Sequence, residues 1–278
     1  MAYIQMNVMS ESLMRTVNVD VILPVDKIHF PGMPVREEKP FKTLYLLHGI
    51  FGSQVDWING TKLQRWAEEK DLAVVMPAGE NMFYVDQPKA HNYYGEFIGK
   101  ELVELTRKMF PLSTRREDTF IGGLSMGGYG ALRNGLKYSD TFGYLVGLSV
   151  ANMIDGIDQR TDDVDLFFES RSYAEVVFGD LSKVEGSDLD IKYLARKMKE
   201  KKAEKPKIYL ACGTDDRALD GNRSLHECFA ANGFDVVFDE DPGNHEWDFW
   251  NDHIKKAIDW LPLEGVAGMN SGNVVADK

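Results

Sequence analysis

The feature that most constrains this chain is a serine flanked by glycines within residues 118–131. A short apolar run, Thr119 to Ile121, is typical of a buried strand, and the sequence Gly-Leu-Ser-Met-Gly follows at 123–127. A helix-like segment, 129–138, comes next. A tight turn between strand and helix exposes a serine for attack, and flanking glycines give the turn room. A Gly-rich turn that only packs closely is the alternative, because short matches occur by chance. The strand and helix around the turn favour Ser125 as a nucleophile.

Strands and helices alternate along most of the remaining chain. The strand-like runs cover 3–9, 13–23, 43–47, 72–76, 119–121, 144–148, 207–212 and 235–238. The helical patterns cover 63–70, 94–109, 129–138, 225–232 and 247–261. The first two runs suit an antiparallel pair, and the alternation after residue 43 suits parallel strands joined by helices. We predict an α/β fold with a mostly parallel central sheet, antiparallel N-terminal strands and helices on both faces.

Residues 1–263 read as one domain. A loop rich in proline and glycine spans 24–40, and a highly charged segment spans 152–205. Strand patterns lie on both sides of that segment, so we interpret it as a helical insertion near the active site and not as a second domain. The last stretch, 264–278, is small and polar. Its composition predicts a disordered tail.

Charge and hydropathy exclude several classes of partner. The 278 residues carry 32 basic and 44 acidic side chains, a net charge of −12. Nucleic acid would be repelled on average. No run of about 18 apolar residues predicts a membrane span, and the first residues do not read as a secretory signal. Cys212 and Cys228 fit buried free thiols in a reducing compartment. We expect a cytoplasmic protein with a small-molecule substrate, and a homo-oligomer is left open.

A serine nucleophile needs a base and an acid that orients the base. Among the six histidines, His245 alone combines a place after the serine with a turn between the last strand and the last helix. Asp215 and Asp216 directly follow the preceding strand. Spacing does not decide between these two carboxylates. We expect the backbone N–H groups of Met126 and Ile50, with Phe51 as second choice, to bind the oxyanion. His48 is expected to shape the turn before Ile50.

Four motifs resemble the tributyrin esterase branch of the esterase D / S-formylglutathione hydrolase family. They read Leu-Leu-His-Gly at 46–49, Asp-Thr-Phe-Ile-Gly-Gly-Leu-Ser-Met-Gly-Gly-Tyr-Gly-Ala at 118–131, Cys-Gly-Thr-Asp-Asp at 212–216 and His-Glu-Trp at 245–247. The resemblance covers residues 3–263. It implies the α/β-hydrolase fold and cleavage of short-chain acyl esters without a cofactor.

The same resemblance implies a role for each matching residue. Ser125 is then the nucleophile, His245 the base and Asp216, the fourth residue of G-T-x-D, the acid. Met126 and Ile50 are the oxyanion donors. The glutathione thioester branch has a histidine before the serine, where this chain has Leu124. That departure argues against S-formylglutathione as the substrate.

We therefore expect a serine carboxylesterase that acts on short acyl esters through a Ser-His-Asp triad and an acyl-enzyme. The alternatives are an acetylxylan or feruloyl esterase on carbohydrate esters, and an S-formylglutathione hydrolase. Candidate substrate-binding residues are Phe51, Tyr84, His91 and Trp247. We expect no metal, because Phe249 stands where H-E-x-x-H requires its second histidine. A binding protein without activity is the remaining class, and failure of a fluorophosphonate to label the serine would favour it.

Overall fold

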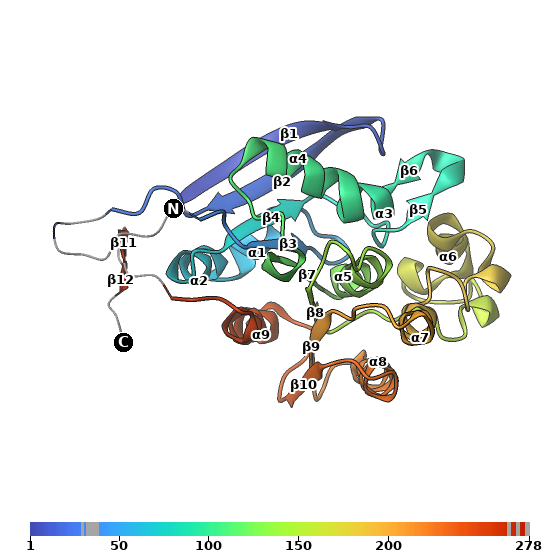
Figure 1. The fold of residues 1–278 in the computed structure, drawn as a ribbon. Coiled ribbons are helices and arrows are strands. Elements are labelled where there is room, and N and C mark those ends of the chain that lie inside the picture. Colours follow the sequence, from blue (N-terminus) through green and yellow to red (C-terminus); the bar gives the residue numbers. More distant parts are fainter. Residues whose placement is uncertain (29–30, 32–38, 266–267, 271–272, 276–278) are drawn as a thin grey trace.

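A computed structural model describes residues 1–28, 31, 39–265, 268–270 and 273–275 (Figure 1). The main strands are Ala2–Ser10 (β1), Arg15–Leu23 (β2), Thr43–Leu47 (β3), Ala73–Pro77 (β4), Thr119–Leu124 (β7), Tyr144–Leu148 (β8), Lys207–Gly213 (β9) and Val236–Asp241 (β10). They form one eight-stranded sheet in the order β1-β2-β4-β3-β7-β8-β9-β10. The pairs β1–β2 and β2–β4 are antiparallel, and all pairs from β4 to β10 are parallel. The predicted fold class is confirmed.

Helices cover both faces of this sheet. Their bounds are Asp56–Gly60 (α1), Leu63–Glu69 (α2), Tyr94–Glu96 (α3), Leu102–Met109 (α4), Met126–Lys137 (α5), Arg171–Phe178 (α6), Ile191–Lys201 (α7), Leu219–Ala231 (α8) and Trp247–Trp260 (α9). Figure 1 shows α2 and α9 on one side and α4, α5 and α8 on the other. Successive side chains of β3 therefore enter different cores, with Tyr45 and Leu47 in one and Leu44 and Leu46 in the other. Burial on both faces is the reason for the continuous apolar sequence of this strand.

Short elements fill the connections. They are Asp86–Gln87 (β5), Asn92–Tyr93 (β6), Gly268–Asn270 (β11), Asn273–Val275 (β12), the 3-10 turns Pro88–Ala90 (η1), Arg116–Asp118 (η3), Ile157–Gln159 (η4), Phe167–Glu169 (η5) and Leu181–Lys183 (η6), and the π-helical segment Phe97–Glu101 (η2). The helix predicted over 94–109 is therefore interrupted by a π segment. Where the sequence predicted a disordered tail over 264–278, β11 and β12 pair antiparallel, and 266–267, 271–272 and 276–278 lie outside the described residues. Most of the predicted loop 24–40 also lies outside them.

The segment 152–205 packs on the main domain. Its helices α6 and α7 contribute side chains to the core that α5 shares. The guanidinium of Arg133 on α5, only 1% exposed, pairs with Asp188 at 2.9 Å. The hydroxyl of Tyr129 donates to the Leu189 carbonyl at 2.6 Å. These contacts tie the insertion to the helix that begins at the serine turn.

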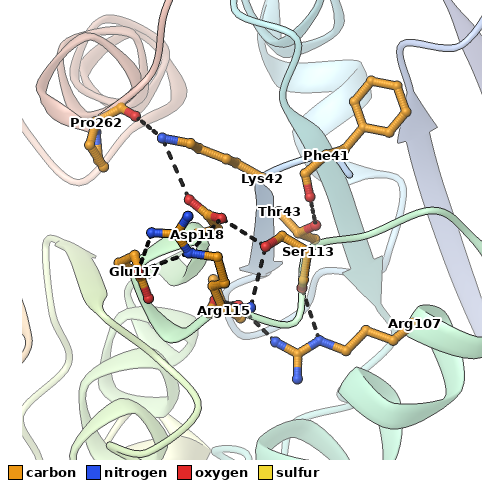
Figure 2. Close-up of polar contacts among 10 residues, drawn as sticks. Phe41, Lys42, Thr43, Arg107, Ser113, Arg115, Glu117, Asp118 and Pro262 are labelled. Carbon is orange, nitrogen blue, oxygen red and sulfur yellow. Dashed lines mark hydrogen bonds and ion pairs between the residues drawn. The ribbon is translucent and has the colours of Figure 1, made fainter. Parts of the chain in front are cut away.

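A polar network holds the amino ends of β3 and β7 (Figure 2). The ammonium of Lys42 donates to the Pro262 carbonyl at 2.6 Å and pairs with Asp118 at 3.5 Å. Asp118 accepts from the Ser113 hydroxyl at 2.7 Å, and Arg107 donates to the Ser113 carbonyl at 3.1 Å. The chain after α9 is thereby tied to one end of the sheet. The carboxyl ends of the parallel strands, where such sheets bind ligands, lie at the opposite end.

Candidate active site

Ser125 occupies the turn between β7 and α5. Its φ of 51° and ψ of −117° are a backbone conformation that residues with a side chain rarely adopt, and such strain is typical of functional turns. A Cβ on Gly123 would come within 2.4 Å of the backbone of Gly127, and a Cβ on Gly127 within 2.4 Å of the Leu47 carbonyl oxygen. Both glycines are therefore required by close backbone approach. Helix α5 begins at Met126, three residues before the predicted start, so the serine lies directly at its N-terminus.

The side chains of Ser125, His245 and Asp216 form one hydrogen-bonded chain. His245 Nε2 lies 3.0 Å from Ser125 Oγ, and His245 Nδ1 lies 2.9 Å from Asp216 Oδ2. A carboxylate only accepts, so Nδ1 carries the proton and Nε2 is left to accept from the hydroxyl. This is the tautomer that a histidine base requires.

Two loops carry Asp216 and His245 side by side. The Thr214 amide donates to the Asp241 carbonyl, and the Asp215 amide to the Gly243 carbonyl, each at 2.9 Å. A Cβ on Gly213 would meet the Gly243 carbonyl oxygen at 2.3 Å. Backbone contacts between the chain after β9 and the chain after β10 thus set the distance between Asp216 and His245.

The two adjacent aspartates have opposite environments. The Asp216 side chain is 1% exposed and also accepts from the Ala218 amide at 2.8 Å, whereas Asp215 is exposed. Burial raises the pKa of Asp216, but hydrogen bonds from His245, the Ala218 amide and Ser149 outweigh it, so the pKa lies below its ordinary value. Asp216 therefore stays ionised while buried against the imidazole.

The loop after β3 presents its backbone to the serine. The Phe51 amide donates to Asn81 Oδ1 at 2.9 Å, and Phe51 has a φ of 67°. The Phe51 amide is therefore already hydrogen-bonded. The amide of Ile50 is the better candidate for an oxyanion donor on this loop. Ile50 and Met126 both line the cavity at Ser125. The sequence did not single out Asn81, which lies on the loop after β4.

His48 shapes this loop, as expected. Its Nδ1 donates to the Gly49 carbonyl at 2.7 Å, and its Nε2 accepts from the Gly79 amide at 2.8 Å. Burial lowers the pKa of His48, which keeps the ring neutral and able to accept. The hydroxyl of Tyr84 donates to the His48 carbonyl at 3.0 Å. Tyr84 is fully buried and is a packing residue.

A cavity of about 680 Å³ opens at Ser125 and His245. Phe51 and Trp247, two of the four candidate substrate-binding residues, line it, and the insertion adds Asn152, Met153, Asp155, Arg160, Phe168 and Glu169. Tyr84 and His91 are not among the lining residues, and His91 is exposed with its ring against Tyr93. The prediction placed both on a loop that does border the site, but loop position does not say which way a side chain points. In the sequence, the highly charged composition of residues 152–205 was the signal that this segment forms a wall of the cavity.

Within the described part of the chain, Asp239, Asp241 and His253 place possible metal-ligand atoms within 4.8 Å of one another. Asp241 Oδ2 lies 2.9 Å from His253 Nε2 and also contacts the Lys256 ammonium. The positively charged Lys256 ammonium thus already lies beside Asp241, where a metal ion would have to bind. Asp239 accepts from the Tyr209 hydroxyl at 2.6 Å. We read this cluster as a salt-bridge network that is separate from the cavity lining.

Among the described helices, none has both the length and the apolar composition needed to cross a lipid bilayer. The fold and the serine–histidine–aspartate arrangement define the class of the protein, a serine hydrolase of the α/β-hydrolase type. Residues 10–261 match the family described as "Putative esterase", and the chain belongs to this family. It is therefore an enzyme that hydrolyses carboxylic esters.

Three relatives illustrate the similarity. An "Acetyl esterase" of Caldicellulosiruptor saccharolyticus is 45% identical over 94% of this chain and 98% of its own length. The substrate-bound structure of the fluorophosphonate-binding serine hydrolase FphF of Staphylococcus aureus is 32% identical, with a TM-score of 0.80 over 94% of this chain and 98% of that one. An S-formylglutathione hydrolase from the same organism is also 32% identical, with a TM-score of 0.79 and the same coverage. The expected esterase family is confirmed at this level, and the tributyrin branch stays a prediction.

Proposed function

We propose that this enzyme hydrolyses short-chain acyl esters, acetyl esters foremost, through a triad of Ser125, His245 and Asp216. The observation that carries the proposal is the continuous chain of contacts at 3.0 Å and 2.9 Å, which ends at a serine on the cavity wall. The acetyl preference is supported by the relative that is named an acetyl esterase.

In the first step, Ser125 Oγ attacks the ester carbonyl carbon and His245 Nε2 takes the hydroxyl proton. Asp216 holds Nδ1–H and stabilises the imidazolium. The imidazolium then gives its proton to the leaving alcohol, and an acyl-enzyme remains on Ser125. In the second step, His245 takes a proton from water and the water oxygen attacks the acyl carbon. The bond between that carbon and Ser125 Oγ then breaks, the imidazolium returns its proton to Oγ, and the carboxylic acid is released.

The amides of Ile50 and Met126 are proposed to bind the oxyanion that forms in both steps. Met126 is the first residue of α5, so its N–H lies at the positive end of the helix dipole. Ile50 precedes a residue whose own amide is held by Asn81. Donors that are fixed before the reaction stabilise the developing charge without reorganisation.

Two alternative substrates follow from specific observations. The cavity combines aromatic residues with Asp155, Arg160 and Glu169, a mixture that suits a polyhydroxylated alcohol such as an acylated sugar. The S-formylglutathione hydrolase relative supports a thioester, but Leu124 departs from that branch as noted.

We also propose the cytoplasm as the location, on the evidence of free Cys212 and Cys228.

The proposal is tested by a rate panel. It compares p-nitrophenyl esters of increasing acyl length, acetylated xylo-oligosaccharides, methyl ferulate and S-formylglutathione. We expect kcat/KM to be highest for acetyl to butyryl esters and to fall with longer chains. Fastest turnover of long-chain esters would contradict the short-chain assignment, and no turnover of any ester would contradict the whole proposal.

A further inference from the structure

The side chain of Asn222, near the start of α8, is fully buried and joins two separate parts of the chain. Its Oδ1 accepts from the Val150 amide at 3.0 Å. Its Nδ2 donates to the Val150 carbonyl at 3.1 Å and to the Ala218 carbonyl at 2.8 Å. A backbone N–H can only donate and a carbonyl can only accept, so these partners also fix which way the amide faces.

Val150, the first of these partners, follows β8 and lies beside the nucleophile. The amide of the next residue, Ala151, donates to the Ser125 carbonyl at 3.1 Å, and the Ser125 amide donates to the Leu148 carbonyl at 2.8 Å. A Cβ on Gly128 would meet Val150 Cγ2 at 3.2 Å, so the Val150 side chain also packs on the first turn of α5. The chain around Val150 therefore holds the turn that carries Ser125.

Ala218, the second partner, lies beside the catalytic acid. Its amide donates to Asp216 Oδ1 at 2.8 Å, while Asp216 Oδ2 lies 2.9 Å from His245 Nδ1. The Leu219 amide donates to the Asp216 carbonyl at 3.0 Å. The turn that carries Asp216 is thus built on the residues at the start of α8, to which the Asn222 side chain is bonded.

We propose that Asn222 is a positioning residue for the triad: its amide joins the chain after β8, which holds Ser125, to the turn before α8, which holds Asp216. This inference rests on the proposed triad. Asn222 is not among the residues that line the cavity, so it acts through these neighbours and not on the substrate. A misplacement of about 1 Å between reacting groups costs up to about 100-fold in rate.

The first test replaces Asn222 by alanine, which removes all three contacts. With p-nitrophenyl acetate we expect kcat per competent site to fall about tenfold to a hundredfold, with KM within about twofold of the wild type. Titration with a fluorophosphonate counts the competent sites. A residue that only stabilises the fold would change the number of competent sites or the urea midpoint and leave kcat per site at the wild-type value. That result would overturn the proposal.

Asn222→Ser separates the two partners and serves if the alanine variant does not fold. A serine within a helix donates to the carbonyl four residues earlier, so this variant keeps a bond to Ala218. Its side chain is shorter than that of asparagine and loses both contacts with Val150. We expect kcat per site to fall at least about fivefold. A wild-type kcat in Asn222→Ser would show that the contacts with Val150 do not position the triad.

Two controls match the alanine variant in chemistry and in stability. Asn232 Nδ2 donates to the Cys228 carbonyl at 2.7 Å at the other end of α8, so Asn232→Ala removes a similar bond far from the triad. Leu72→Ala empties part of the core just before β4 and lowers the urea midpoint. Both controls should keep the wild-type kcat per site. A fall in either control as large as that of Asn222→Ala would overturn the assignment.

A double-mutant comparison shows whether Asn222 acts through the acid. The loss caused by Asn222→Ala should be at least about threefold smaller in an Asp216→Asn background than in the wild type. Equal losses in the two backgrounds would contradict the proposed role. Turnover by Ser125→Ala would instead refute the triad itself, which is a distinguishable result.

Discussion

The side chain of Asn81 holds the amide of Phe51 at 2.9 Å and thereby decides which backbone N–H groups of this loop are free to face the substrate. Asn81 is also held through its backbone, because the Tyr173 hydroxyl donates to the backbone carbonyl of Asn81 at 2.5 Å. The loop after β4, the loop after β3 and helix α6 of the insertion thus meet at one residue. The loop after β3, which carries the proposed oxyanion donor Ile50, is positioned by contacts from two other parts of the chain.

Replacing Asn81 by alanine should release the Phe51 amide and loosen the turn at Ile50. The loss of one neutral hydrogen bond is about 0.5 to 1.5 kcal/mol, so we expect kcat to fall about twofold to tenfold on p-nitrophenyl acetate. Asn92→Ala, on β6 and outside the cavity lining, is the control. Equal kcat values for the two variants would show that Asn81 does not position the loop after β3 for catalysis.

Ser125→Ala should abolish ester hydrolysis and leave the fold intact. Removing the nucleophile of such a triad costs at least about 10⁴-fold in kcat. The measurement is kcat on p-nitrophenyl acetate together with the circular dichroism spectrum and labelling by a fluorophosphonate. Ser139→Ala, at the end of the α5 region, should retain both activity and labelling. Turnover by Ser125→Ala near the wild-type rate would refute the proposed mechanism.

The adjacent aspartates should respond very differently to substitution by asparagine. Asp216→Asn keeps the shape of the side chain but favours the wrong imidazole tautomer, which costs about 10⁴-fold in a comparable serine protease. Asp215 is exposed, so Asp215→Asn should cost about tenfold or less. Measurement of kcat for both variants checks the assignment. A severe loss in Asp215→Asn with a nearly normal Asp216→Asn would reverse it.

Glu101 should give the protein a pH-dependent share of its stability. Its carboxylate accepts from the Ser10 hydroxyl at 2.8 Å and from the amides of Glu11 and Ser12 at 2.6 Å and 3.0 Å. Burial raises the pKa of Glu101, but these bonds outweigh it and the pKa lies below its ordinary value. A lowered pKa in the folded state means that the contribution is present above the unfolded pKa and is lost as pH falls through the folded one.

Glu101→Gln should therefore lower the free energy of unfolding by about 1 to 3 kcal/mol at pH 7. The difference from the wild type should shrink as the pH falls below about 4. Urea unfolding at several pH values measures it, with the exposed Glu104→Gln on α4 as the control. A deficit that stays constant down to pH 3 would show that the charge of Glu101 is not what stabilises the β1–β2 turn.

Local sequence patterns determined the fold class and much of the site. Burial on both faces produces continuous apolar runs such as Thr43–Leu47. The sequence pattern therefore predicts the parallel strands without the structure. The turn at Ser125 is also local, because Gly123 and Gly127 are needed within five residues of chain. Chain order and a position after the last strand singled out His245, which the structure brings to Ser125.

Tertiary structure decided what depends on the direction of a side chain or on the register of distant segments. Spacing left Asp215 and Asp216 equivalent, and only the packing of the β9 and β10 loops buries the second of them. Tyr84 was predicted at the pocket, but its ring is buried and its hydroxyl bonds to the His48 carbonyl. Asn81 and Asn222 gave no local signal, since the backbone amides that they bind lie 30 and 72 residues away along the chain. Such contacts form only once the sheet has brought the carboxyl ends of its strands together. No short-range sequence propensity therefore predicts them.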